Sequence, residues 1–294
     1  MKVPIEIVVP AMTFILLAAV GLDLTAADFA HVRRHLVVVL AGLVAPLVVL
    51  PSIAVGLTRL FQASPEVTAG LLIITACPIG GISNTYSYLA RASTALSVTL
   101  TGLSCVCASV TIPLVGKGFE MALAQPFPLS VPIPLLVGQL VLVLGLPVAV
   151  GMWVRRRAPD LAERAHLVLR RLAFLGIGVV LLLVIVDDPL AFASGLWTTV
   201  PMAAVFVVSS MGAGWMTATL VTRDSRDRFT LAVEFGTRNV AVATTIAVAL
   251  LGRVDFARFA ATYFLTEIPL MLVAVALFRH RQALIGARRA ASST

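Results

Sequence analysis

Long apolar stretches alternate with short polar or charged segments along the whole of this 294-residue chain. A membrane helix needs roughly 20 consecutive apolar residues, because the hydrocarbon core of a bilayer is about 30 Å thick. On this criterion the pattern predicts nine membrane-spanning helices. Their expected ranges are 5–22, 35–58, 66–91, 94–115, 130–154, 169–186, 196–221, 227–252 and 256–279. The predicted fold class is therefore an all-α membrane protein.

The composition supports this fold class and argues against two others. Hydrophobic residues make up 60% of the chain and charged residues 12%, with a mean hydropathy of +1.03, which is too apolar for a soluble globular domain. The formal net charge of +8 does not indicate nucleic-acid binding, because the basic residues stand in short runs between apolar stretches. The cysteines Cys77, Cys105 and Cys107 all lie in apolar stretches, which indicates reduced packing residues rather than disulfides or a zinc site.

The distribution of lysine and arginine predicts how the chain lies in the membrane, since cytoplasmic loops carry an excess of both. With the N-terminus outside, sixteen of the 22 basic residues fall on the inner side, five on the outer side, and Arg238 within a span. A cleaved signal peptide is not favoured, because Lys2 and Glu6 precede the first span whereas Arg33 and Arg34 follow it. We expect a multi-pass protein of the inner (cytoplasmic) membrane with its C-terminus in the cytoplasm.

Two of the predicted spans are interrupted by the same short pattern, Gly-x-x-Asn, at Gly81–Asn84 and at Gly236–Asn239. Unwound backbone at membrane depth is tolerated only inside protein or beside a polar cavity. A matched pair of interrupted spans in the two halves of a chain points to the binding site of a secondary transporter. The alternative is chance, because glycine is common in membrane helices.

The positions of the two interrupted spans also predict the domain organisation. Four spans precede and four follow the central span, so the two interrupted spans are expected to run in opposite directions, as in an inverted-topology repeat. The predicted ranges are 5–115 for the first repeat, 130–154 for the connecting span and 169–279 for the second repeat, within one transmembrane domain, 1–294.

Three ionisable residues are expected well inside spans, namely Glu234, Arg238 and Glu267. Each costs about 2.5–3.5 kcal/mol at the bilayer centre on insertion scales, so each needs a partner or a wet cavity. Their formal sum is −1, which calls for one compensating cation, either Na⁺ or a proton. A structural ion pair between Glu234 and Arg238, with Glu267 protonated, is the alternative, and the two interpretations can hold together because a carboxylate has two oxygens.

Oxygen-bearing side chains near these charges are candidates for a Na⁺ site. Ser83 and Asn84 lie at the first interruption, while Ser97 and Thr101 are four residues apart and share one face of the next helix. Together with Glu234 they offer the hydroxyl, amide and carboxylate oxygens that hard cations prefer. The alternative is packing or hydrogen bonding within the bundle, which is the usual role of single Ser and Thr residues in membrane helices.

A new helical segment is expected to begin after each interruption, and its first N–H groups carry a partial positive charge. Two such ends at mid-membrane, with Arg238 beside them, would favour an anion. The predicted substrate is therefore a small or amphipathic organic anion, in the first place a carboxylate. The residues expected to border it are Gly81, Ile82, Arg238, Asn239 and Glu267.

The two interrupted segments resemble a known family. The run Cys77–Val98 is similar to the core motif of the bile acid:sodium symporter family, here in a form like its bacterial members, and Glu234–Ala243 is similar to the second motif. The likeness extends over essentially the whole chain, including Gly21–Phe29. It implies a core domain with two crossing broken helices, a panel domain, and alternating access by movement of one against the other. It also implies a sodium site at the five oxygen-bearing residues named above.

The resemblance further implies a second sodium site, and there the sequence departs from the family. A side-chain amide of the family is replaced by Arg238, and a family glutamine on an earlier span falls at Ala41. Because a guanidinium cannot ligate a cation, we expect one Na⁺ rather than two, with Arg238 as a built-in positive charge. Glu267 stands where the family often has a small polar residue, so it is expected either to pair with Arg238 or to bind a proton.

The expected function is uptake of an organic anion by Na⁺ symport, without enzymatic activity. The family does not fix the substrate, which could be a bile acid, a pantoate-like compound, a keto acid or another carboxylate. A proton-coupled or uncoupled carrier is the alternative. An intramembrane enzyme is disfavoured because the histidines lie in loops or at span ends, and a channel or sensor is disfavoured by the matched interruptions. The expected partners are the substrate and the lipid bilayer, with no nucleic acid, for a monomer or weak oligomer.

Overall fold

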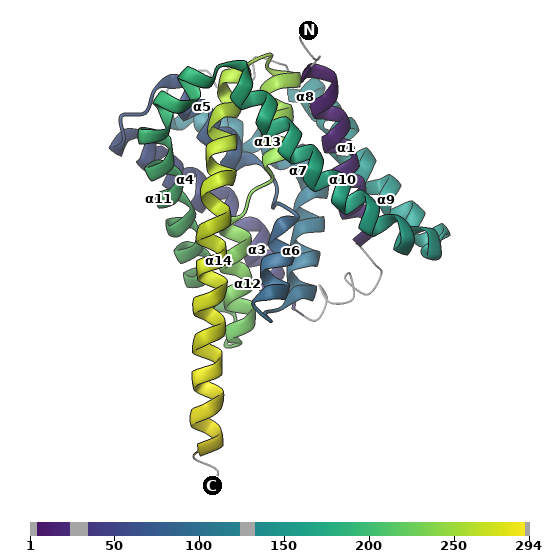
Figure 1. Cartoon of the computed structure of the whole chain (residues 1–294), viewed down its shortest axis with the longest axis vertical. Coiled ribbons are helices and arrows are strands. Elements are labelled where there is room, and N and C mark those ends of the chain that lie inside the picture. Colours follow the sequence, from purple (N-terminus) through teal and green to yellow (C-terminus); the bar gives the residue numbers. More distant parts are fainter. Residues whose placement is uncertain (1–4, 24–34, 124–132, 292–294) are drawn as a thin grey trace.

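The structure is a computed structural model that describes residues 5–23, 35–123 and 133–291. Within these ranges the chain is almost entirely helical and contains no β-strand, and its helices pack side by side into a bundle (Figure 1). Expectations that fall on Lys2, Arg33 and Arg34, and on most of the run Gly21–Phe29, lie outside the described residues.

The helices follow one another with short connections. In chain order they are α1 (Ile5–Asp23), α3 (Leu36–Val44), α4 (Pro46–Leu60), α5 (Pro65–Ala76), α6 (Ile82–Leu89), α7 (Thr94–Leu123), α8 (Ile133–Leu140), α9 (Leu146–Arg157), α10 (Pro159–Asp187), α11 (Pro189–Val221), α12 (Ser225–Gly236), α13 (Val240–Thr245) and α14 (Val254–Ala291). Two π-helical segments, η1 (Val141–Gly145) and η2 (Ile246–Leu250), join α8 to α9 and extend α13.

Many of these helices suit a membrane by length and composition. Five are long and apolar enough to cross one, namely Leu36–Leu60, Thr94–Phe119, Val137–Arg157, Pro189–Val221 and Val254–Ile285. Four further apolar helices are shorter, namely Val8–Asp23, Pro65–Ala76, Leu175–Asp187 and Val240–Leu250. The all-α membrane fold is thereby confirmed, whereas the number of nine spans stays a prediction.

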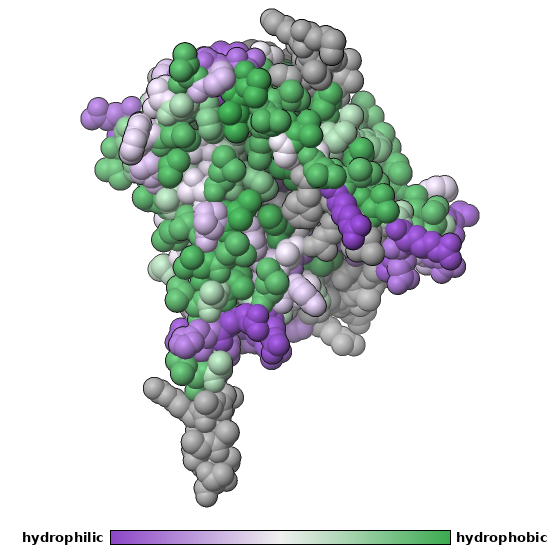
Figure 2. Space-filling view, in the orientation of Figure 1, coloured by the Kyte–Doolittle hydropathy of each residue, from purple (hydrophilic) through white to green (hydrophobic). Residues whose placement is uncertain are grey.

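The surface has the polarity that a bilayer requires. Leu190, Trp197 and Leu220 of α11 expose between 83% and 89% of their surface, which would be unfavourable in water but not in lipid. Figure 2 shows apolar side chains across the middle of the molecule and hydrophilic side chains towards its two ends. Such a band is expected of a protein whose middle faces hydrocarbon and whose ends face water.

The helices divide into two groups by their packing. α1 packs mainly against α9 and α10, on the right of Figure 1, whereas α11 packs against α12 and α14, on the left. Gly21 and Gly151 bring α1 and α9 into backbone contact, since a Cβ on Gly151 would lie 2.8 Å from the Cα of Gly21. The two groups are candidates for the panel and core domains, and the inverted repeats stay a prediction.

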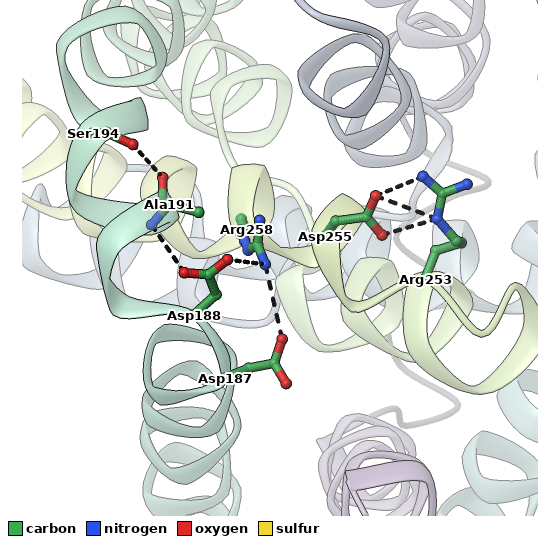
Figure 3. A network of polar contacts seen from close by, with 7 residues as sticks. All are labelled: Asp187, Asp188, Ala191, Ser194, Arg253, Asp255 and Arg258. Atoms are coloured by element: carbon green, nitrogen blue, oxygen red, sulfur yellow. Dashed lines mark hydrogen bonds and ion pairs between the residues drawn. The ribbon is translucent and has the colours of Figure 1, made fainter.

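A polar network ties the joint between α10 and α11 to the start of α14 (Figure 3). Asp188 caps α11 by accepting a hydrogen bond from the Ala191 N–H at 3.0 Å. The Arg258 guanidinium of α14 lies 3.3 Å from Asp188 and 3.8 Å from Asp187. Because these side chains are partly exposed, each pair is worth at most about 1 kcal/mol. The network helps to set the position of α14, whose next turns reach the two helix interruptions.

Candidate functional site

Both predicted interruptions are present, and they lie against each other. Residues 77–81 separate α5 from α6, and residues 237–239 separate α12 from α13. Ile79 and Arg238 form an antiparallel bridge between the two segments. Two hydrogen bonds accompany the bridge, from Asn239 N to Pro78 O at 2.9 Å and from Gly80 N to Thr237 O at 3.4 Å. Each interruption therefore satisfies part of the other's unwound backbone, as the absence of water requires.

Side chains from neighbouring helices satisfy further backbone groups at this crossing. The Ser104 hydroxyl of α7 accepts a hydrogen bond from Ile79 N at 3.1 Å. The Tyr263 hydroxyl of α14 accepts from Arg238 N at 2.9 Å and donates to Gly236 O at 2.6 Å. The crossing is thus held from α7 on one side and from α14 on the other.

Gly80 allows the close approach of the two interruptions. A Cβ at this position would lie 2.8 Å from the Arg238 carbonyl oxygen and 3.3 Å from the Thr237 methyl group. Since real Cβ atoms essentially never come within 3.0 Å of another heavy atom, any larger residue would force the two segments apart.

The five residues predicted to hold a cation converge on one carboxylate. Glu234 is fully buried and accepts hydrogen bonds from Ser97 at 2.5 Å, from Ser83 at 3.1 Å and from Thr101 at 3.4 Å. The Asn84 amide oxygen lies 2.8 Å from the Ser97 hydroxyl and 3.3 Å from that of Thr101. These side chains come from α6, α7 and α12, so the cluster connects three helices.

In this oxygen cluster, formed by the side chains of Ser83, Asn84, Ser97, Thr101 and Glu234, close oxygen–oxygen contacts outnumber the hydroxyl protons that could lie in them. Its six oxygen atoms make six contacts of 2.5–3.4 Å, including one of 3.2 Å between Ser83 and Thr101. The three hydroxyl groups supply one proton each, so three contacts bring lone pairs together without a proton between them. A hard cation among these oxygens would relieve the repulsion, and carboxylate, amide and hydroxyl oxygens are the ligands it prefers. The residues present therefore fit a Na⁺ ion.

Arg238 does not pair with Glu234. Within the described residues, no ion pair of 4.0 Å or less involves the Arg238 guanidinium. Its Nη2 atom donates a hydrogen bond to the Cys77 carbonyl oxygen, while Nε and Nη1 have no partner among the described residues. The Asn239 amide nitrogen is also buried and unpartnered, although its oxygen caps α13 by accepting from Val242 N at 3.2 Å. The crossing therefore holds a buried positive charge with unused donors.

A cavity of about 370 Å³ adjoins these donors. Its lining residues come from both groups of helices, namely Leu16, Ala19, Val20 and Asp23 of α1, Ile177 of α10, Gly80, Gly81, Ile82, Asn84, Thr85, Tyr88, Thr94, Val98, Arg238, Asn239, Val240 and Phe264. Four of the five residues predicted to border the substrate are among them. The fifth, Glu267, does not line the cavity and lies fully buried beside Thr237 and Tyr86.

The cavity-lining face of α1 and the backbone contacts of Ser104 and Tyr263 were not predicted from the sequence. The four lining residues of α1 are spaced as one helical face, and this spacing is visible in the sequence. It does not distinguish a face that lines a cavity from one that packs against a helix. Ser104 and Tyr263 act on backbone atoms that the fold brings to them, so no sequence pattern indicates their role.

Together these features define an all-α membrane protein with a buried polar site where two interrupted helices meet. Residues 9–194, more than half of the chain, match the Sodium Bile acid symporter family. The chain belongs to this family, and the resemblance drawn from the two motifs is confirmed.

Three relatives extend the comparison beyond residue 194. The chain is 28% identical over 238 residues to an uncharacterized sodium-dependent transporter, YocS, of Bacillus subtilis, which covers 80% of this chain and 72% of the relative. It is 26% identical over 239 residues to a probable sodium/metabolite cotransporter, chloroplastic BASS2 of Oryza sativa, and the match covers 79% of this chain and 54% of the relative. It is 27% identical over 223 residues to the human sodium-dependent organic anion transporter, covering 74% and 57%. The chain thus spans little more than half the length of the last two.

Proposed function

We propose that this chain is a secondary active transporter that takes up an organic anion together with Na⁺ by alternating access. One observation carries the proposal: the oxygen cluster around Glu234 and the unused donors of Arg238 and Asn239 lie at the same crossing of interrupted helices. Asn84 belongs to both parts, because its amide oxygen is in the cluster and the residue lines the cavity. A cation and an anion can therefore influence each other's binding there. The names of the relatives support sodium coupling.

Na⁺ would be held by Ser83, Asn84, Ser97, Thr101 and Glu234. Its entry down a tenfold concentration gradient supplies about 1.4 kcal/mol to drive accumulation of the substrate, and the membrane potential adds nothing when one Na⁺ enters with a monovalent anion. The protein's part is to hold α6, α7 and α12 together around the ion. Because α6 begins directly beside the cavity, ordering its first turn also orders the lining residues Gly81 and Ile82.

Arg238 is proposed to bind the anion. A buried guanidinium without an ion-pair partner is costly, and a carboxylate substrate would supply the missing charge with two hydrogen bonds at once. The cavity volume of about 370 Å³ lies in the range of small-molecule sites. Its lining is largely apolar beyond the crossing, which favours an organic carboxylate over an inorganic anion. With Arg238 as a fixed charge, one Na⁺ per cycle is expected.

The orientation is also a proposal, namely an inner-membrane protein with the N-terminus outside and the C-terminus in the cytoplasm. α1 begins at one end of the molecule and α14 ends at the other (Figure 1). The cavity reaches Asp23 at the end of α1 and Thr94 at the start of α7. The excess of arginine favours the cytoplasmic side for that end, and the cavity would then open inwards. A monomer or weak oligomer in the bilayer is expected, with a small-molecule substrate.

A ligand screen by thermal unfolding tests the proposal. Purified protein is heated with cholate, pantoate or pyruvate, in NaCl or in choline chloride of equal ionic strength. A ligand of the folded state raises the unfolding temperature by mass action, so at least one anion is expected to stabilise more strongly in Na⁺. That anion is then followed into proteoliposomes with and without an inward Na⁺ gradient. Equal stabilisation and uptake in both salts would refute sodium coupling and leave a proton-coupled or uncoupled carrier.

A further inference from the structure

Glu267 of α14 lies in the interior of the bundle without a partner. It is fully buried, and among the described residues neither of its carboxyl oxygens has a hydrogen bond or an ion pair within 4.0 Å. The hydroxyl groups of Thr237 and Tyr86 lie beside it, are also buried, and can each donate a hydrogen bond to one of its carboxyl oxygens. These two donors can satisfy the carboxyl oxygens, but among the described residues no ion pair balances the charge of an ionised Glu267, and an unpaired charge is strongly disfavoured in the interior.

This place is separate from the oxygen cluster around Glu234, although the same segments build both. The first interrupted helix contributes Ser83 to the cluster, and its Tyr86, three residues further on, lies beside Glu267. The second interrupted helix contributes Glu234 to the cluster, and Thr237, again three residues further on, lies beside Glu267. No residue is shared between the two groups.

The groups that face Glu267 suit a proton better than a metal ion. A sodium ion needs several oxygen ligands, whereas among the described residues the side chains that can hydrogen-bond to the carboxyl group are those of Thr237 and Tyr86. A single proton removes the charge and leaves both carboxyl oxygens hydrogen-bonded, because one can then donate to the Thr237 hydroxyl oxygen while the other accepts from Tyr86. The other titratable or charged groups nearby are Tyr263, one turn earlier on α14, and Arg238, which is directed to the Cys77 carbonyl oxygen.

The charges of the site agree with a neutral Glu267. With Na⁺ beside Glu234 the two charges cancel, which leaves the single positive charge of Arg238. A monovalent carboxylate substrate then makes the loaded site neutral only if Glu267 carries a proton. With Glu267 ionised, the same site would hold a net negative charge at membrane depth, where unpaired charge is strongly disfavoured.

We propose that Glu267, Tyr86 and Thr237 form a proton-binding site, distinct from the sodium site, that keeps Glu267 neutral at the helix crossing. The proposal deepens the proposed function, because the charge count above assumes Na⁺ and an anion at their sites. The binding of the proton itself requires neither ligand, so it can be tested in their absence.

Infrared difference spectroscopy of the protein in lipid, without Na⁺ or substrate, is the direct test. At neutral pH the native protein is expected to show the carbonyl-stretch band of a protonated carboxylic acid, and Glu267→Gln is expected to lose it. The matched control Glu163→Gln, at an exposed position on α10, is expected to keep the band. Tyr86→Phe is expected to keep the band but shift it to higher frequency, because one hydrogen bond to the carboxyl group is lost.

Two results would overturn the proposal. One is a native spectrum without any such band that depends on Glu267, which would show an ionised carboxylate. The other is a reduced sodium stoichiometry in Glu267→Gln, measured by ²²Na⁺ binding, which would show a second sodium site instead. If native protein showed the band but bound no Na⁺ at all, the proton site would stand and the sodium-coupled function would fall.

Discussion

Removal of the charge at Glu234 is expected to abolish stabilisation of the protein by Na⁺. Glu234 is the one charged member of the oxygen cluster, and the other four residues offer neutral oxygens. Glu234→Gln keeps the size of the side chain but replaces one acceptor oxygen by an NH₂ donor. The variant thus removes the charge that attracts the cation and turns one ligand position into a repulsive one.

The size of the effect follows from the geometry. Opposite unit charges about 4 Å apart attract by about 4 kcal/mol at an effective dielectric constant near 20, and a bound ion lies closer than that. At about 1.4 kcal/mol per tenfold change in affinity, the loss corresponds to roughly a thousand-fold weaker Na⁺ binding. At a Na⁺ concentration of about 100 times the native Kd, native protein gains about 2.7 kcal/mol, whereas the variant gains about 0.1 kcal/mol.

The order of the two stabilities should therefore reverse with the salt. In choline chloride, native protein holds a buried carboxylate without a counter-charge, so Glu234→Gln is expected to be at least as stable. In NaCl the native protein is expected to be the more stable of the two. Thermal unfolding in both salts measures this, with Glu163→Gln, the same change on the exposed surface of α10, as the control that keeps the native response. If Glu234→Gln kept more than half of the rise in unfolding temperature that NaCl gives the native protein over choline chloride, Glu234 would not be a sodium ligand.

Three further variants test the anion site and the helix contacts. Arg238→Gln is expected to lose anion-induced stabilisation and to raise the number of ²²Na⁺ ions bound per protein, measured without substrate, from one towards two. An unchanged number would argue against a fixed charge in place of an ion. Gly80→Ala is expected to lower the free energy of unfolding by about 1–3 kcal/mol, because its Cβ would meet the Arg238 carbonyl oxygen at 2.8 Å. It is also expected to reduce the rise in unfolding temperature that Na⁺ produces. Gly56→Ala, inside α4 and with nothing within 4 Å of the added Cβ, is the control in thermal unfolding and is expected to be as stable as the native protein or slightly more stable. Gly151→Ala is expected to push α1 away from α9 and to lower the free energy of unfolding by a similar amount. Gly178→Ala, whose added Cβ meets nothing within 4 Å, is its control and is not expected to lower it. Equal melting temperatures for these two variants would contradict the close backbone contact between α1 and α9.

Much of the architecture could be predicted because it follows from the bilayer. Apolar stretches of sufficient length mark helices, and glycine or proline within such a stretch marks an interruption. The members of the oxygen cluster could also be named in advance, since Ser97 and Thr101 are four residues apart on one helix and Ser83 and Asn84 follow a break. What the residues could not supply was the meeting of these helices, which depends on contacts between Ile79 and Arg238, 159 positions apart.

The suggested ion pair between Glu234 and Arg238 shows a limit of sequence spacing. Residues four apart face each other only while the helix continues. α12 ends at Gly236, so the unwound backbone at residues 237–239 turns the Arg238 side chain away from Glu234 and towards the Cys77 carbonyl oxygen. The same interruption that indicated a binding site thus invalidated the helical spacing used to pair the charges.

The arrangement suggests how occupation of one site can change the other. The oxygen cluster takes side chains from both interrupted helices, and the donors proposed for the anion lie in the second interruption, which is bridged to the first. A cation that holds Glu234 against Ser83 therefore also stabilises the bridge and, with it, the position of Arg238. Because coupling between two binding sites is reciprocal, an anion at Arg238 must raise the affinity for Na⁺ by the same factor. Glu267 lies beside Thr237 in the same interruption, so a neutral carboxyl group there, as proposed, would leave the positive charge of Arg238 available to the substrate.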